Sequence, residues 1–104
     1  MENNVTMVKL DIEGKYIDFT DFYGVNKIII YNNIINLFED FKDKKKKLLV
    51  LELSANIQNI EWKTELEFSR KEIHILKRDI LPFFEEIEDY ETCEKVRKLC
   101  ETIK

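Results

Sequence analysis

The pattern of apolar and polar positions predicts a β-hairpin near the start of the chain. Apolar residues alternate with polar ones up to Ile12, and Gly14 can then take the positive φ that a two-residue primed turn needs. Pairing Ile12 with Lys15 brings the apolar residues of both strands onto one face. The same register sets Lys9 opposite Asp18, which is a favourable pair of charges. The apolar face of this hairpin consists of Val8, Leu10, Ile17 and Phe19.

Residues 21–43 have the apolar spacing of an amphipathic helix. The stripe consists of Ile28, Tyr31, Ile35 and Phe38, with Ile34 and Phe41 beside it. The β-branched run at residues 28–30 permits a second interpretation, in which residues 27–31 form a strand and Asn32 or Asn33 caps a shorter helix. We predict the longer helix.

Two further strands are predicted in the middle of the chain. Residues 48–53 form an apolar run that is typical of a central strand, and residues 54–59 are polar and loop-like. From residue 60 to residue 68 apolar side chains alternate strictly with charged ones, which predicts one buried and one solvated face. The buried face consists of Ile60, Trp62, Thr64, Leu66 and Phe68. Trp62 is therefore expected in the core.

A helix is predicted to begin at Ser69, because Ser69 and Glu72 have the spacing of a capping box. Its apolar stripe consists of Ile73, Leu76, Ile80, Phe84 and Ile87. Pro82 either kinks this helix or lies in the first turn of a helix capped by Asp79. In the second case residues 72–76 could form an edge strand.

The last predicted helix runs from about Tyr90 to Ile103. Its core face consists of Cys93, Val96, Cys100 and Ile103. Together these elements predict a small α+β domain with an antiparallel sheet of about four strands. One helix follows the first hairpin, and a C-terminal helix pair packs on one face of the sheet.

Composition indicates one domain, residues 1–104, with a highly charged surface. The chain is 44% hydrophobic and 37% charged, and its formal net charge is −4. A net-acidic domain is a poor candidate for gripping phosphate backbones, so a nucleic acid is not the expected partner. Abundant Ile, Asn and Lys beside a single alanine are typical of AT-rich coding and indicate a low-GC bacterium or its phage.

The sequence predicts a cytoplasmic protein with no membrane contact. The first residues lack the basic and apolar regions of a signal peptide, and the apolar runs are too short to span a bilayer. Cys93 and Cys100 lie two helical turns apart, which separates their Cα atoms by roughly 10 Å and excludes a disulfide. Two buried thiols in a reducing compartment are therefore expected.

The sequence contains no catalytic or metal-binding pattern. His74 is the single histidine, and it falls off the apolar stripe beside basic residues. Ser54 and Ser69 lie in no nucleophile elbow, and there is no paired-cysteine zinc motif or calcium loop. Gly14 and Gly24 stand alone, so there is no glycine-rich phosphate loop. We predict a protein that is not an enzyme and that uses no cofactor and no metal.

A basic run follows the predicted long helix. Its lysines are Lys42, Lys44, Lys45, Lys46 and Lys47. Cations at a helix C-terminus complement the helix dipole and then solvate a loop. The run could instead contact nucleic acid or lipid headgroups, although no aromatic residue alternates with the lysines to stack on bases.

The most distinctive feature is an acidic segment between Phe84 and Glu94 that contains no base. Its carboxylates belong to Glu85, Glu86, Glu88, Asp89, Glu91 and Glu94. The helix before it begins with bases and ends with acids, which its dipole disfavours by about 0.3–1 kcal/mol per charge. If the last two helices are antiparallel, the acids meet at one tip, which either is a solvated corner or attracts a basic partner.

We therefore predict a small cytoplasmic protein that binds or inhibits a macromolecule with a basic surface through this acidic segment. An accessory or anti-defence protein of a phage or mobile element, or a toxin-neutralising immunity protein, would have this size and charge. The alternative is a nucleic-acid-binding module that uses the lysines of residues 42–47.

Overall fold

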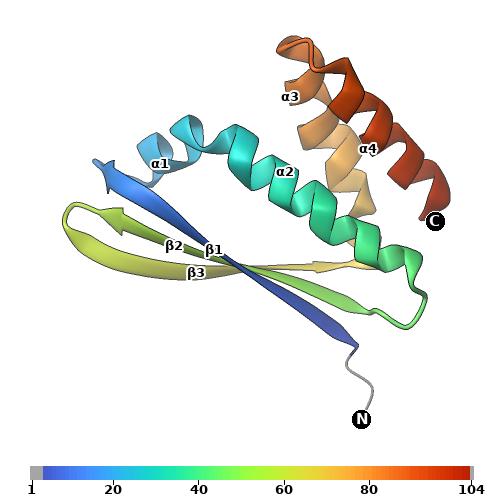
Figure 1. The fold of residues 1–104 in the computed structure, drawn as a ribbon, viewed down its shortest axis with the longest axis horizontal. Helices are drawn as coiled ribbons and strands as arrows, with labels where there is room; N and C mark the ends of the chain where they lie inside the picture. The colour runs from blue at the N-terminus through green and yellow to red at the C-terminus, as the bar shows by residue number, and fades with distance from the viewer. Residues whose placement is uncertain (1–3, 104) are drawn as a thin grey trace.

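The computed structural model describes residues 4–103 and shows a sheet with helices on one face (Figure 1). The strands of this sheet are β1 (Val5–Tyr16), β2 (Leu48–Ile57) and β3 (Ile60–Ser69). β2 lies in the centre, parallel to β1 and antiparallel to β3. The predicted α+β domain is confirmed. The predicted antiparallel sheet of about four strands is not, because the sheet within residues 4–103 is mixed and has three strands.

The helices form two groups along the chain. Between β1 and β2 lie α1 (Phe19–Val25), α2 (Lys27–Phe38) and the 3-10 turn η1 (Glu39–Lys42). After β3 come the 3-10 turn η2 (Arg70–Ile73), the π-helical turn η3 (Leu76–Ile80), α3 (Leu81–Glu86) and α4 (Tyr90–Thr102). α2 lies over the sheet, and α3 and α4 stand together on the same side as α2 (Figure 1).

The predicted hairpin at Gly14 is wrong, because β1 continues as one strand to Tyr16. Gly14 does have a positive φ, of +111°, but it lies in a bulge where the pairing with β2 shifts between Asp11 and Lys15. Within this bulge the Tyr16 hydroxyl donates a hydrogen bond of 2.9 Å to the carbonyl oxygen of Glu13. Positive φ suits a bulge as well as a turn, so the local pattern does not distinguish the two.

The side chains assigned to a second hairpin strand have other roles. Asp18 caps α1 by accepting a hydrogen bond of 2.8 Å from the backbone N–H of Asp21. Lys9 lies 3.9 Å from Glu52 on β2 and not opposite Asp18. Ile17 is exposed. The expected buried face of that hairpin therefore does not form.

The helix predicted over residues 21–43 is confirmed in type but is interrupted at Asn26. The side-chain amide and the backbone N–H of buried Asn26 both donate to the carbonyl oxygen of Phe22, at 2.9 and 3.2 Å. The Asn26 carbonyl accepts from the N–H of Ile30 at 2.9 Å, so one residue ends α1 and begins α2. The alternative strand over the isoleucine run is wrong. Ile30 is buried, whereas Ile28 of the predicted stripe is exposed.

β2 and β3 are confirmed as strands, but the loop between them is shorter than predicted. β2 continues to Ile57, and only Gln58 and Asn59 form the turn. Both residues have positive φ, at 55° and 64°, as a two-residue primed hairpin turn requires. The prediction of a loop over residues 54–59 is therefore corrected.

Trp62 is not a core residue. It lies on the helix-facing side of β3 with Phe68, which is buried, but Trp62 and Ile60 are 45% and 55% exposed. The turn end of β2 and β3 extends beyond α2, and only the short helix α1 lies near it (Figure 1). The alternating pattern identified the correct face, but the helices do not cover its whole length.

The capping box at Ser69 and Glu72 is confirmed, with the Glu72 carboxylate accepting from the Ser69 N–H. The helix that begins there is first a 3-10 turn and then a π-helical turn that leads directly into α3. Pro82 lies in the first turn of α3, but the cap position is not Asp79, which instead pairs with Arg78 at 2.9 Å. The alternative edge strand before it is also wrong.

The last predicted helix is confirmed as α4, which Asp89 caps. Its core face contains buried Cys93, Val96 and Ile103, whereas Cys100 is partly buried.

Beneath α2, the core contains a cluster of aromatic rings. Phe38 is fully buried, with its ring centroid 5.4 Å from those of Phe41 and Phe68. α2 and β3 thus share one packed cluster.

We predict that Phe38→Ala lowers the free energy of unfolding by about 3–5 kcal/mol, because it removes a fully buried ring and leaves a cavity. Urea denaturation monitored by circular dichroism measures this change. Ile28→Ala on the exposed side of α2 is the matched control and should change stability by less than about 1 kcal/mol. Equal losses in the two variants would contradict the core assignment.

Candidate functional site

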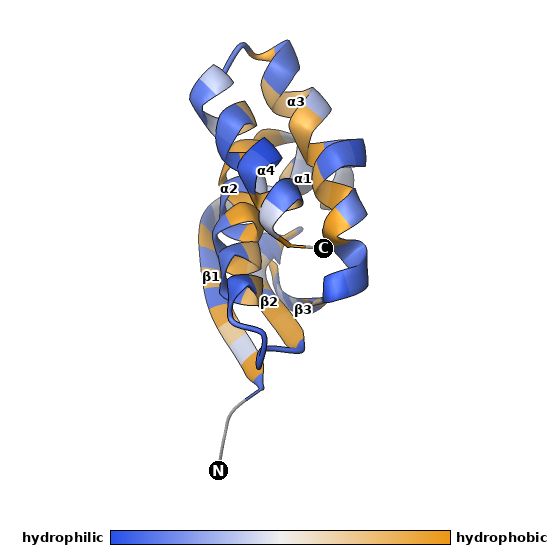
Figure 2. Cartoon of the chain, turned by 90° about the vertical axis from the view of Figure 1, so that its right-hand side faces the viewer, coloured by the Kyte–Doolittle hydropathy of each residue, from blue (hydrophilic) through white to orange (hydrophobic). Residues whose placement is uncertain are grey.

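The acidic segment forms the turn between α3 and α4, which we call the acidic turn (residues 85–94). The turn is at the top of Figure 2, where most of the ribbon has the hydrophilic colour. Glu85 and Glu86 end α3, Asp89 caps α4, and Glu91 lies in the first turn of α4. Between them Glu88 has a left-handed φ of 60°, which reverses the direction of the chain. The structure therefore brings the predicted acids to one tip.

Three of the six carboxylates of the acidic turn have partners within the fold. The guanidinium of Arg97 lies 3.7 Å from Glu85 and 3.8 Å from Glu94. The Asp89 carboxylate accepts hydrogen bonds from the backbone N–H and the hydroxyl of Thr92, at 3.2 and 2.7 Å. These groups hold α3 and α4 together and define where α4 begins.

The other three, Glu86, Glu88 and Glu91, are exposed and form no ion pair within residues 4–103. Glu91 has a local role, because an acid in the first turn of α4 complements the helix dipole. Glu86 and Glu88 have no such role. Their negative charge is directed to solvent and is available to a partner.

Two apolar side chains are exposed among these acids. Ile87 is 44% exposed and Tyr90 is 64% exposed. The sequence placed Ile87 on the buried stripe of its helix, and this is wrong because the chain leaves the helix at Ile87 and turns at Glu88. Exposed tyrosine and isoleucine surrounded by charges resemble the composition of protein-binding surfaces.

A second surface feature, which the sequence did not reveal, is an aromatic groove of about 510 Å³ on α1 and the start of α2. Phe19, Tyr23 and Tyr31 contribute rings to this groove, Gly24 and Ile30 also line it, and Lys27 supplies the charge. Of these residues, the sequence pattern assigned Phe19 to a hairpin face and Tyr31 to a helix stripe. The break at Asn26 changes their direction, and the sequence pattern does not show it.

Further rings extend the groove at both ends. Trp62 of β3 meets Phe19 with the ring centroids 5.5 Å apart. Phe83 of α3 meets Tyr31 at 5.4 Å, and the ammonium of Lys27 lies 5.7 Å from the Tyr31 ring centroid and 5.4 Å from that of Phe83. Phe83 is part of the helix that ends in the acidic turn, so the groove and the turn are joined through α3.

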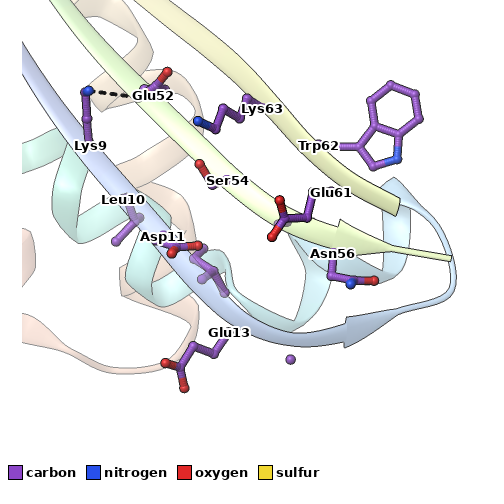
Figure 3. Close-up of a pocket in the computed structure, with 13 residues that line it drawn as sticks. Lys9, Leu10, Asp11, Glu13, Glu52, Ser54, Asn56, Glu61, Trp62 and Lys63 are labelled. Carbon is purple, nitrogen blue, oxygen red and sulfur yellow. Dashed lines mark ion pairs between the residues drawn. The ribbon is translucent and has the colours of Figure 1, made fainter. Parts of the chain in front are cut away.

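The outer face of the sheet carries a polar hollow of about 570 Å³ (Figure 3). Its side chains come from all three strands and carry charges of both signs, with Lys9 3.9 Å from Glu52, Lys63 near this pair, and Glu61 farther along near Asn56. The Asn56 Oδ1 atom is buried and has no hydrogen-bond partner among residues 4–103. Asp11 and Glu13 also line the hollow, so its four acids outnumber its two bases and its lining is net negative.

The lysine run begins with Lys42 at the end of η1 and continues through the loop before β2, at the other end of the molecule from the aromatic groove (Figure 1). Asp43 orders the loop by accepting a hydrogen bond of 3.0 Å from the N–H of Lys45. The guanidinium of Arg70 donates to the Asp43 carbonyl and lies over the ring of Phe41, which is buried. The loop therefore presents cations without an exposed ring beside them.

The side chains with possible chemical reactivity include the two thiols and the single imidazole. Burial raises the pKa of the thiols of Cys93 and Cys100, so both stay protonated near neutral pH. Nδ1 of His74 lies 2.9 Å from the carbonyl oxygen of Lys71, to which it donates. Within the described part of the chain, no group of three or more His, Cys, Asp and Glu side chains could hold a metal ion.

Gly24, which lines the aromatic groove, has room for a larger side chain. A Cβ atom added to Gly24 would meet no heavy atom within 4 Å, and the residue lies inside α1. Gly24→Ala should therefore raise the free energy of unfolding by about 0.5–1 kcal/mol, because alanine favours the helix. Urea denaturation measures the change.

Gly14→Ala is the matched control, because Gly14 has a φ of +111° and an added Cβ would lie 3.1 Å from the Tyr16 hydroxyl oxygen. This variant should be destabilised. A loss of stability in Gly24→Ala comparable to that in Gly14→Ala would show that Gly24 is needed for packing within the chain.

Within residues 4–103 no helix is both long enough and apolar enough to cross a membrane.

Comparison with known proteins assigns no family and no function to these surfaces. The chain matches no protein-family model, no curated protein and no solved structure.

Proposed function

We propose that this chain is a small cytoplasmic binding protein that occupies or inhibits a macromolecular partner with a basic surface. The acidic turn is the contact surface. Accessory or anti-defence proteins of phages and mobile elements, and toxin-neutralising immunity proteins, are the classes of protein that work in this way. The observation that carries the proposal is the combination of unpaired acids with exposed Ile87 and Tyr90 on one protruding turn.

The unpaired acids supply attraction over a distance. A concentrated charge of one sign steers an oppositely charged partner and raises the association rate, and salt screens this effect. Glu86 is the last residue of α3, where the helix dipole disfavours its charge by about 0.3–1 kcal/mol. A basic partner group at this position would relieve that repulsion. The charge is therefore better explained by a partner than by the stability of the fold.

The exposed apolar side chains supply contact area once the partner has arrived. Tyrosine is enriched among the residues that contribute most to protein interfaces, because its ring buries a large area and its hydroxyl keeps a hydrogen-bond partner. Tyr90 lies at the start of α4, beside Asp89, so its backbone position is fixed by the helix cap. Steering by acids and anchoring by Tyr90 together describe a protein-binding surface.

The charge-reversal variant Glu86→Lys, Glu88→Lys is expected to lose the partner, because it replaces two exposed acids whose carboxylates form no ion pair within residues 4–103. The matched control is Glu65→Lys, Glu67→Lys on exposed positions of β3. Each pair changes the formal net charge from −4 to 0, since every Glu→Lys change adds two units. Both variants should keep the unfolding midpoint of the wild type to within a few degrees.

Tagged forms of all three proteins are used to capture partners from bacterial lysate in the presence of nuclease, with identification by mass spectrometry. A basic protein retained by the wild type and the β3 control, and lost by the acidic-turn variant, is the expected result. The purified pair should then associate about tenfold more slowly with the acidic-turn variant at low salt. Retention by all three baits, or by none, would contradict the proposal, and loss on nuclease treatment would favour the lysine run.

Tyr90→Ala separates anchoring from steering. Because Tyr90 is 64% exposed, its removal should leave the fold intact. The dissociation rate of the captured partner should rise by about tenfold or more, with an unchanged salt dependence of association. Surface plasmon resonance measures both rates. An unchanged dissociation rate would show that the contact is electrostatic only.

A further inference from the structure

The aromatic groove carries an inference that deepens the proposed function and rests on it. Exposed aromatic rings rarely gather on the surface of a monomeric domain unless something binds there. Here the exposed rings of Trp62, Phe19 and Tyr23 lie along a hollow of about 510 Å³, and the partly buried rings of Tyr31 and Phe83 continue from them. Such concave surfaces, with rings and one charge, bind flat apolar groups.

Gly24 indicates that a group from outside approaches the helix backbone. It lies inside α1, where glycine is unfavourable, and an added Cβ would meet nothing within 4 Å among the described residues. Packing within residues 4–103 therefore gives no reason for a glycine. A side chain at this position would fill the groove, and its absence keeps the groove open.

Lys27 indicates that the group is aromatic. Its ammonium lies over the rings of Tyr31 and Phe83 and forms no ion pair within residues 4–103. A third ring entering the groove would meet this ammonium across its face and the existing rings edge to face, which are the favourable geometries for both contacts. An aliphatic side chain would gain only the burial of its surface.

The acidic turn indicates which partner supplies the ring. Phe83 contacts Lys27 and Tyr31 at the border of the groove, and Glu86 follows Phe83 by one helical turn of α3. Side chains spaced in this way lie on the same face of a helix, roughly 5–6 Å apart at Cβ. A partner whose base meets Glu86 thus places a neighbouring side chain at the groove. We propose that the groove receives an aromatic side chain of the same basic protein that the acidic turn binds.

The first test uses a defined probe, N-acetyl-tryptophanamide, and the full chain labelled with nitrogen-15. The chain has two glycines, whose amide signals are easily recognised. Gly24 lies in the groove, and Gly14 lies in the bulge of β1 as an internal control. Saturable shifts are expected for the amides of Gly24, Lys27 and Thr20, which also lines the groove, without a shift for Gly14. N-acetyl-leucinamide at equal concentration should shift them less. Equal shifts by both probes, or shifts at Gly14 only, would overturn the proposal.

The second test joins the groove to the acidic turn with two peptides, acetyl-Trp-Lys-Lys-amide and acetyl-Ala-Lys-Lys-amide. The wild type should bind the tryptophan peptide about tenfold more tightly than the alanine peptide. Gly24→Leu, which places a side chain in open space and should keep the fold, is expected to abolish this tenfold preference and to keep the salt-dependent binding of the lysines. The variant Glu86→Lys, Glu88→Lys is expected to lose the salt-dependent binding of the lysines and to keep the preference for the tryptophan peptide.

The two proposals therefore fail in different ways. A tryptophan preference that is absent in the wild type, or that survives in Gly24→Leu, overturns the inference about the groove and leaves the acidic turn standing. Lysine-dependent binding that survives charge reversal contradicts the proposed function. If N-acetyl-tryptophanamide binds as tightly as the tryptophan peptide, the groove is a site for a free aromatic molecule and the inference of a protein anchor is wrong.

Discussion

The parallel pairing of β1 with β2 is the constraint on which the rest of the structure depends. β2 is the central strand, and Leu49, Leu51 and Leu53 are almost completely buried between the neighbouring strands and the helices. Two parallel neighbours cannot be joined by a tight turn, because the chain must return to the end where it started. The segment between them therefore has to cross over one face of the sheet as α1, α2 and η1.

This crossover determines where both candidate surfaces lie. α1 comes immediately after β1 and stays near the turn end of β3, which brings Phe19 against Trp62. α2 then covers the sheet, and α3 packs beside the start of α2, which brings Phe83 against Tyr31. The groove itself lies on α1 and the start of α2, rings from β3 and α3 border it at its two ends, and α3 connects it to the acidic turn.

Within the helical layer, two residues decide the direction of the chain. Asn26 uses its buried side chain and its backbone to end one helix and begin the next, and Glu88 reverses the chain through a left-handed φ of 60°. Asp89 and Arg97 then hold the second reversal by capping α4 and pairing with acids on both helices. Part of the acidic turn thus builds the fold. The remaining acids, together with Ile87 and Tyr90, are the part that we propose for recognition.

The sequence by itself determined the features that depend on near neighbours. Strict alternation predicted β3, the capping box at Ser69 and Glu72 predicted where the next helical segment begins, and the apolar spacing predicted α4. The six acids were evident from their positions alone. Only the tertiary structure decided the partner of β1, because positive φ at Gly14 satisfies a bulge and a turn equally. It also decided the exposure of Trp62 and Ile87, because a pattern shows which face of an element is apolar, whereas burial depends on how far distant segments extend over that face.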